Sequence, residues 1–147
     1  MARKVFFSFK YDDVDRAMNV RNSNVIQADA KYGFIDKAEF EEVQRKGEAA
    51  IKSWIDGQLV GTTVTVVLVG ANTNKSKWVK YEIDQSIARG NGLLTIDISQ
   101  ISNLRQQTSS CCGLTVSGYK HYLWNKDSGR ENLGKWVEDA AKAAGKV

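Results

Sequence analysis

Residues 62–69, Thr-Thr-Val-Thr-Val-Val-Leu-Val, are the segment that most limits how this chain can fold. Every residue except Leu68 is β-branched, and such side chains favour the extended backbone of a strand. Toward Val69 the segment becomes continuously apolar, without the alternation of a strand that has one face in water. It is therefore predicted to be a central strand that is covered on both faces.

Shorter apolar runs and helical stripes surround this strand. The further strands are expected at residues 5–9, 25–28, 93–98 and 119–124. The helices are expected from 14 to a break at 22–24, from about 40 to 58, from a Ser76 N-cap to about 89, and around 133–144. Gly57 and Gly61 are predicted to end the second helix, and Gly90 the third. The alternation predicts an α/β fold, with a central mostly parallel sheet and helices on both faces.

Composition limits the class of protein. The 147 residues, 42% apolar and 26% charged, fit one soluble domain spanning 1–147. The net charge of +4 is spread along the chain, so it does not indicate a nucleic-acid binder. The apolar run near Met1 is too short for a signal peptide or a membrane span, so we expect the cytoplasm. One histidine and the adjacent pair Cys111 and Cys112 are too few for a zinc site, and no metal is expected.

Open parallel sheets bind their ligands at the carboxyl ends of the strands. The sequence signatures of several common kinds of site are absent from these ends. The segments at these ends are 9–13, 70–78 and the region from Ser99. The first has no glycine, which excludes a phosphate-binding loop. The central strand ends without a carboxylate, which argues against a phospho-acceptor receiver domain. His121, the single histidine, lies inside an expected strand and reads as an ordinary strand residue.

One carboxylate stands out on the helix after the central strand. Val79, Ile83 and Ile87 are predicted to pack that helix on the sheet, with Trp78 and Glu82 together on the adjacent flank. The structural interpretation makes Glu82 a solvated residue paired with a cation and Trp78 a core residue. However, none of the positions three or four residues from Glu82 is cationic. A carboxylate beside an indole is partly desolvated, which tends to raise its pKa.

Four stretches of the sequence carry a resemblance to a known family. They are Lys4-Val-Phe-Phe-Ser-Phe-Lys-Tyr-Asp-Asp13, Arg21-Asn-Ser23, Val64 to Gly70, and Lys77-Trp-Val-Lys-Tyr-Glu-Ile83. Together they resemble the TIR-like domains of bacterial Thoeris anti-phage systems, of the ThsB type. The resemblance covers roughly residues 4–98 and weakens after Ser99.

This resemblance implies a flavodoxin-like TIR fold that uses NAD as a substrate, with no cofactor. Such enzymes break the nicotinamide–ribose bond, and the Thoeris type makes a cyclic ADP-ribose isomer that is read by a separate effector protein. The resemblance assigns the catalytic carboxylate to Glu82 and a neighbouring substrate contact to Trp78. The loop at 29–36 corresponds loosely to the loop after the family's second strand. One wall of the nucleotide pocket is assigned to Ser8, Phe9, Lys10, Tyr11 and Asp12.

Other interpretations remain open at this point. The alternative to an enzyme is a non-catalytic TIR-like module that acts by protein interaction and self-association. Nucleic-acid binding is a weaker third hypothesis. Tyr11 and Asp12 could serve only as helix caps. Side chains with a structural interpretation are Trp54 and Trp136 as core, Lys75, Lys77 and Lys80 as a solvated face, and Cys111 and Cys112 as ordinary thiols.

Overall fold

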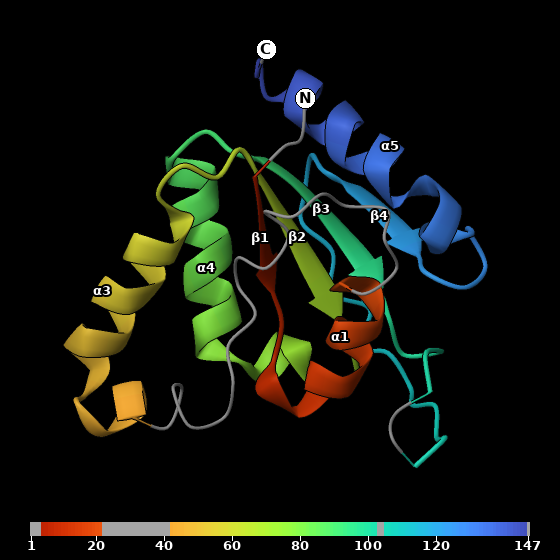
Figure 1. Cartoon of the computed structure of the whole chain (residues 1–147), viewed down its shortest axis with the longest axis horizontal. Helices are drawn as coiled ribbons and strands as arrows, with labels where there is room; N and C mark the ends of the chain where they lie inside the picture. The colour runs from red at the N-terminus through yellow and green to blue at the C-terminus, as the bar shows by residue number, and fades with distance from the viewer. Residues whose placement is uncertain (1–3, 22–41, 103–104, 147) are drawn as a thin grey trace.

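A four-stranded parallel sheet forms the centre of the computed structural model, which describes residues 4–21, 42–102 and 105–146 (Figure 1). Its strands are β1 (Val5–Ser8), β2 (Val64–Val69), β3 (Gly92–Asp97) and β4 (Lys120–Leu123), in the spatial order β1-β2-β3-β4. All three strand pairs are parallel, as predicted. The strand expected at 25–28 and the loop expected at 29–36 lie outside the described residues.

Helices cover both faces of the sheet. They are α1 (Val14–Arg21), α3 (Glu48–Leu59), α4 (Lys77–Ala88) and α5 (Gly129–Ala143), with short 3-10 turns η1 (Tyr11–Asp13) and η3 (Thr73–Lys75) before α1 and α4. Figure 1 shows α3 and α4 on one side of the sheet and α1 and α5 on the other. The α/β architecture predicted from the sequence is therefore confirmed. No helix among the described residues is long and apolar enough to cross a membrane.

Strand β2 is buried along its whole length, which confirms its predicted central position. Because successive side chains of a strand point to opposite faces, its residues divide between two apolar clusters. Val66 and Leu68 pack with α1 and α5, whereas Val67 and Val69 pack with α4. The stiff, β-branched side chains thus fill both layers of the molecule.

Strand β1 follows the same alternation. Phe7 belongs to the cluster under α1 and α5, while Phe6 packs with α3. Ser8, two residues after Phe6, therefore points toward the α3 and α4 side of the sheet. Its side chain is fully buried there.

The second expected helix is interrupted near its beginning. The sequence indicates one helix from about residue 40, and residues 42–45 are indeed helical, but Gly47, whose φ of 96° is incompatible with a continuing helix, separates them from α3, which begins at Glu48. Gly57 lies inside α3 rather than at its exit, so that part of the prediction was wrong. Gly61, with a φ of 82°, does mark the exit.

Helix α4 begins as predicted but packs with a different residue near its end. The Ser76 hydroxyl accepts a hydrogen bond from the Val79 amide at 3.2 Å, which confirms the N-cap. Val79 and Ile83 are buried, but Ile87 is 41% exposed, so its predicted place in the packing row was wrong. Ser86 is buried instead, because a 3.6-residue helix returns to the sheet at i+7 rather than i+8. Its hydroxyl lies 2.7 Å from that of Thr65 in β2.

The two tryptophans assigned to the core differ in depth. Trp136 of α5 is buried and stacks on Tyr122 of β4, with ring centroids 4.0 Å apart. Trp54 of α3 is partly buried and packs against the cluster of Phe6, Ile51, Ile55 and Leu59. Both residues serve packing, as expected.

Candidate active site

Glu82 lies on the side of α4 that faces β1. The side chain is partly buried, and its Oε1 accepts a hydrogen bond of 2.7 Å from the hydroxyl of Ser8. Within the described part of the chain no lysine or arginine forms an ion pair with it. Thus a buried hydroxyl of the neighbouring strand, rather than the cation of the structural interpretation, is the partner of this carboxylate.

The surroundings of Glu82 raise the pKa of its carboxyl group. Burial raises the pKa of Glu82 to about 8, while the hydrogen bond from Ser8 opposes the shift by favouring the charged form. The rise expected from the sequence is confirmed. A carboxyl group with such a pKa changes its charge near neutral pH, which is typical of groups with a chemical task.

The two oxygens of the Glu82 carboxylate differ in their hydrogen bonding. Among the described residues only Ser8 donates a hydrogen bond to this side chain. Oε1 is therefore anchored to β1, and Oε2 has no hydrogen-bond partner within the part of the chain that the structure describes.

Trp78, four residues before Glu82 on α4, packs toward α3. The indole of Trp78 packs with the α3 cluster and meets Tyr81 edge-on, with ring centroids 6.1 Å apart. The Lys77 ammonium lies over the same indole, 4.9 Å from its centroid. The structure thus gives Trp78 a packing role toward α3, and its contact with a substrate stays a prediction.

Of the residues assigned to the nucleotide wall, Ser8 at the end of β1 is the one whose side chain the structure bonds to Glu82. Phe9 packs against the cluster under α1 and α5, and Tyr11 is partly buried in η1. Lys10 and Asp12 pair with each other at 2.6 Å, and Asp12 remains 65% exposed. The Asp12 side chain therefore binds Lys10. The assignment of this segment to a nucleotide pocket stays a prediction.

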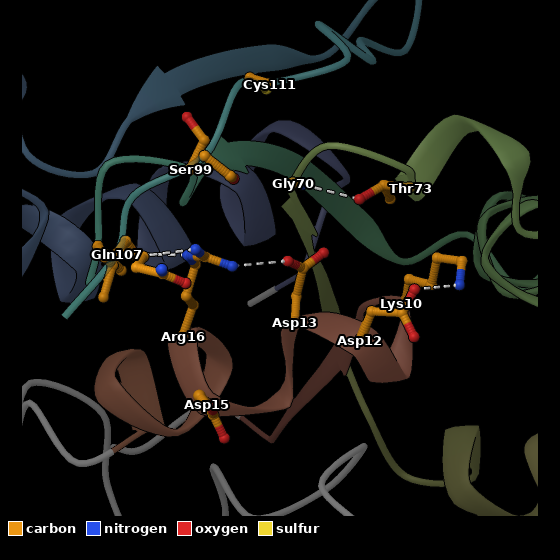
Figure 2. A network of polar contacts seen from close by, with 12 residues as sticks. Lys10, Asp12, Asp13, Asp15, Arg16, Gly70, Thr73, Ser99, Gln107 and Cys111 are labelled. Carbon is orange, nitrogen blue, oxygen red and sulfur yellow. Dashed lines mark hydrogen bonds and ion pairs between the residues drawn. The ribbon is translucent and has the colours of Figure 1, made fainter. Parts of the chain in front are cut away.

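The segments that follow β1 and β3 are joined by a buried ion pair, which sequence reasoning missed (Figure 2). Arg16 of α1 lies 3.3 Å from Asp13, and both side chains are buried. The same guanidinium donates to the carbonyl of Ile101 at 2.7 Å and to that of Gln107 at 3.0 Å. Burial raises the pKa of Asp13, although the Arg16 charge acts against that rise. The i, i+3 spacing of Asp and Arg was the available signal for this pair.

The segment after β3 also crosses the end of β2. The Cys112 amide donates to the carbonyl of Gly70 at 3.0 Å, and the Cys111 thiol lies 3.7 Å from the carbonyl of Val69. Burial raises the pKa of Cys111 to about 11, so the thiol stays protonated and is a poor nucleophile. This placement agrees with the expectation of an ordinary thiol.

A cavity of about 610 Å³ lies away from Glu82, at the amino ends of β3 and β4 beneath the second half of α5. Leu93, Tyr119, Tyr122 and Trp136 contribute to its walls. Because it opens at the opposite end of the strands from Ser8, it is separate from the candidate site. No group of three or more metal-ligating side chains gathers within the described residues.

Comparison with known proteins identifies the family. Residues 6–103 match the family described as the Thoeris protein ThsB, TIR-like domain, and this match contains Ser8, Trp78 and Glu82. The chain is also 35% identical over 140 residues to a protein of Bacillus cereus (strain MSX-D12) named "Putative cyclic ADP-D-ribose synthase ThsB1". That alignment covers 93% of this chain and 72% of the relative. The chain therefore belongs to the TIR-like domain family of the Thoeris protein ThsB.

Proposed function

We propose that this chain is an enzyme of anti-phage defence that cleaves the nicotinamide–ribose bond of NAD and releases a cyclic ADP-ribose isomer. The observation that carries the proposal is the partly buried carboxylate of Glu82, which the hydroxyl of Ser8 anchors through one oxygen at the carboxyl end of β1. The name of the Bacillus cereus relative supports the same reaction class. In this proposal a separate effector protein reads the cyclic product.

One carboxylate is sufficient for the bond cleavage. Nicotinamide leaves NAD with the electron pair of the C1′–N bond, so its ring nitrogen becomes neutral and no acid has to protonate it. The ribose carbon develops positive charge, as in glycoside cleavage. The charged form of Glu82 stabilises this developing charge and can accept hydrogen bonds from the ribose hydroxyls.

Ring closure follows within the same molecule. A nucleophilic oxygen or nitrogen of the ADP-ribose part attacks the ribose carbon and gives up its proton. Because the attacking atom is tethered to the reacting centre, its effective concentration exceeds that of a group in free solution. We expect the wall formed by Phe9, Lys10, Tyr11 and Asp12 to hold the nucleotide near Glu82, with Trp78 at its edge.

The proposal is tested by incubating the purified chain with NAD and following nicotinamide by chromatography and the nucleotide product by mass spectrometry. The expected result is one nicotinamide per NAD consumed and a product that is lighter than ADP-ribose by one water. Because the enzyme can require an infection signal, the assay is run with and without lysate from phage-infected cells lacking the chain.

Two variants of α4 provide the comparison. Glu82→Gln keeps the shape of the side chain and removes its charge, so turnover should fall at least a hundredfold. Asp84→Asn removes a charge from an exposed position of the same helix and should retain turnover. Absence of NAD consumption in both lysate conditions would instead favour a non-catalytic interaction module.

A further inference from the structure

We propose that Ser8 is a positioning residue for the reaction, whose hydroxyl fixes the Glu82 carboxylate at the end of β1 and favours its charged form. This inference rests on the proposed function and refines it, because the resemblance assigns Ser8 to the wall that contacts the nucleotide. The structure instead turns the hydroxyl of Ser8 toward the catalytic carboxylate.

The geometry leaves Ser8 little access to a ligand of its own. Its side chain is fully buried between β1 and α4, and its hydroxyl proton is used in the 2.7 Å bond to Oε1 of Glu82. β1 is paired with the central strand, with Ser8 opposite Val67, so the donor sits on a rigid element. Groups that orient a reacting side chain work best from such elements.

Among the residues that the structure describes, no charged group competes with Ser8 for control of Glu82. On α4 itself Lys80 and Asp84 are exposed, while Lys10 after β1 pairs with Asp12. Asp97 of β3 binds Ser99, and β2 contains no charged residue. The charged side chains of α3 are occupied toward other parts of α4, namely Glu48 with Lys77, Asp56 with Tyr81, and Lys52 over the Tyr81 ring.

This isolation makes the hydroxyl decisive for the charge of Glu82. Burial works against the carboxylate, and the hydrogen bond from Ser8 is the interaction that works for it. A hydrogen bond to a charged group stabilises that group more than one to a neutral group does. Loss of the hydroxyl should therefore raise the pKa of Glu82 further and leave less of the reactive form at neutral pH.

The test follows the Glu82 carboxyl directly in chains labelled with ¹³C at the glutamate carboxyl carbon. The NMR signal of Glu82 is assigned by its loss in Glu82→Gln and is titrated in each variant. Ser8→Ala should raise the titration midpoint by about one pH unit, and Ser8→Thr, which keeps the hydroxyl, should restore it. Thr65→Val removes another buried hydroxyl facing α4 without touching the carboxylate, and it should leave the midpoint unchanged.

Kinetics separate positioning from simple structural damage. In Ser8→Ala, kcat for NAD should fall about tenfold at pH 7 with little change in KM, and the loss should shrink toward pH 9. A structural defect would lower activity equally at both pH values. If Ser8→Ala does not fold, as judged by circular dichroism, Ser8→Cys replaces it, because a thiol of similar shape is a weak donor.

The outcomes distinguish this inference from the proposed function. An active wild-type chain whose Ser8→Ala variant keeps the midpoint and kcat would overturn the positioning role and leave the proposed function intact. A shifted midpoint in a chain without NAD turnover would overturn the proposed function and, with it, the role of Ser8 in catalysis. A shifted midpoint together with a pH-dependent loss of kcat supports both.

Discussion

The carboxylate of Asp13 rests directly against the backbone of Gly70. A β-carbon at Gly70 would lie 2.6 Å from both Cγ and Oδ1 of Asp13, closer than such atoms approach one another. The loop after β1 thereby packs on the loop after β2 without space for any side chain between them. Gly70 is needed here for close approach, because only a residue without a β-carbon fits.

This contact predicts opposite effects for two glycine substitutions. Gly70→Ala should lower the free energy of unfolding by about 1–3 kcal/mol, since the new methyl group has to displace Asp13. Gly57 lies inside α3, and a β-carbon added there would have nothing within 4 Å. Gly57→Ala should therefore raise the free energy of unfolding by about 0.5–1 kcal/mol. Urea denaturation of both variants checks the prediction, and equal stabilities would contradict it.

The Arg16 side chain should be among the most sensitive positions in the chain. Arg16→Met leaves the buried Asp13 without its partner and removes the donors to Ile101 and Gln107, so we expect a loss of about 3–5 kcal/mol. Lys135→Met breaks the exposed pair with Asp139 and should change little. Denaturant unfolding measures both. An Arg16 variant as stable as the Lys135 variant would show that the pair does not hold these loops.

Local signals explain which parts of the fold could be predicted. Most residues of β2 are β-branched and apolar, so the strand can be predicted from its own residues. The Ser76 cap lies three residues from the amide it binds, so it too can be predicted from a short stretch of sequence. The prominence of Glu82 also came from local spacing, because no cation stands three or four residues away.

Long-range contacts explain what could not be predicted. Ser8 and Glu82 are 74 positions apart in sequence, and no pattern within either segment selects one for the other. Arg16 binds backbone carbonyls, which every residue has and which therefore leave no trace in the sequence. The prediction that Ile87 packs on the sheet failed for a different reason. Two helical turns take about 7.2 residues, so a residue eight positions after Val79 lies beyond the buried face.

Glu82 should make the folded chain less stable as the pH rises. The pKa of this carboxyl is raised from 4.5 to about 8 on folding, so between these values the folded chain holds a proton that the unfolded chain has lost. The stabilisation present below about 4.5 is therefore lost as the pH rises through about 8. Glu82→Gln should be more stable than wild type by about 1–3 kcal/mol at pH 9 and nearly equal to it at pH 4.

Thermal unfolding of wild type and Glu82→Gln across this pH range measures the effect. Asp84→Asn is the control, because its exposed side chain should give no comparable trend. A stability difference between wild type and Glu82→Gln that does not change with pH would contradict a buried, titrating carboxyl group.

Trp78 should be needed for the packing of α3 on α4. Trp78→Ala removes the indole from its contacts with Tyr81 and the α3 cluster, and we expect a loss of about 2 kcal/mol, below that of a fully buried tryptophan. Trp78→Phe should retain most of this stability. In that folded variant, an increased KM for NAD is the result expected if the indole also contacts the substrate.

The pH dependence of kcat/KM for NAD tests the central claim most directly, because it reports the ionisation of the free enzyme. The carboxylate of Glu82 is the active form, so kcat/KM should rise about tenfold per pH unit at low pH and level off above a midpoint of about 8. A profile that is flat between about pH 6 and 9, in a chain that cleaves NAD, would contradict the assignment of the reaction to Glu82.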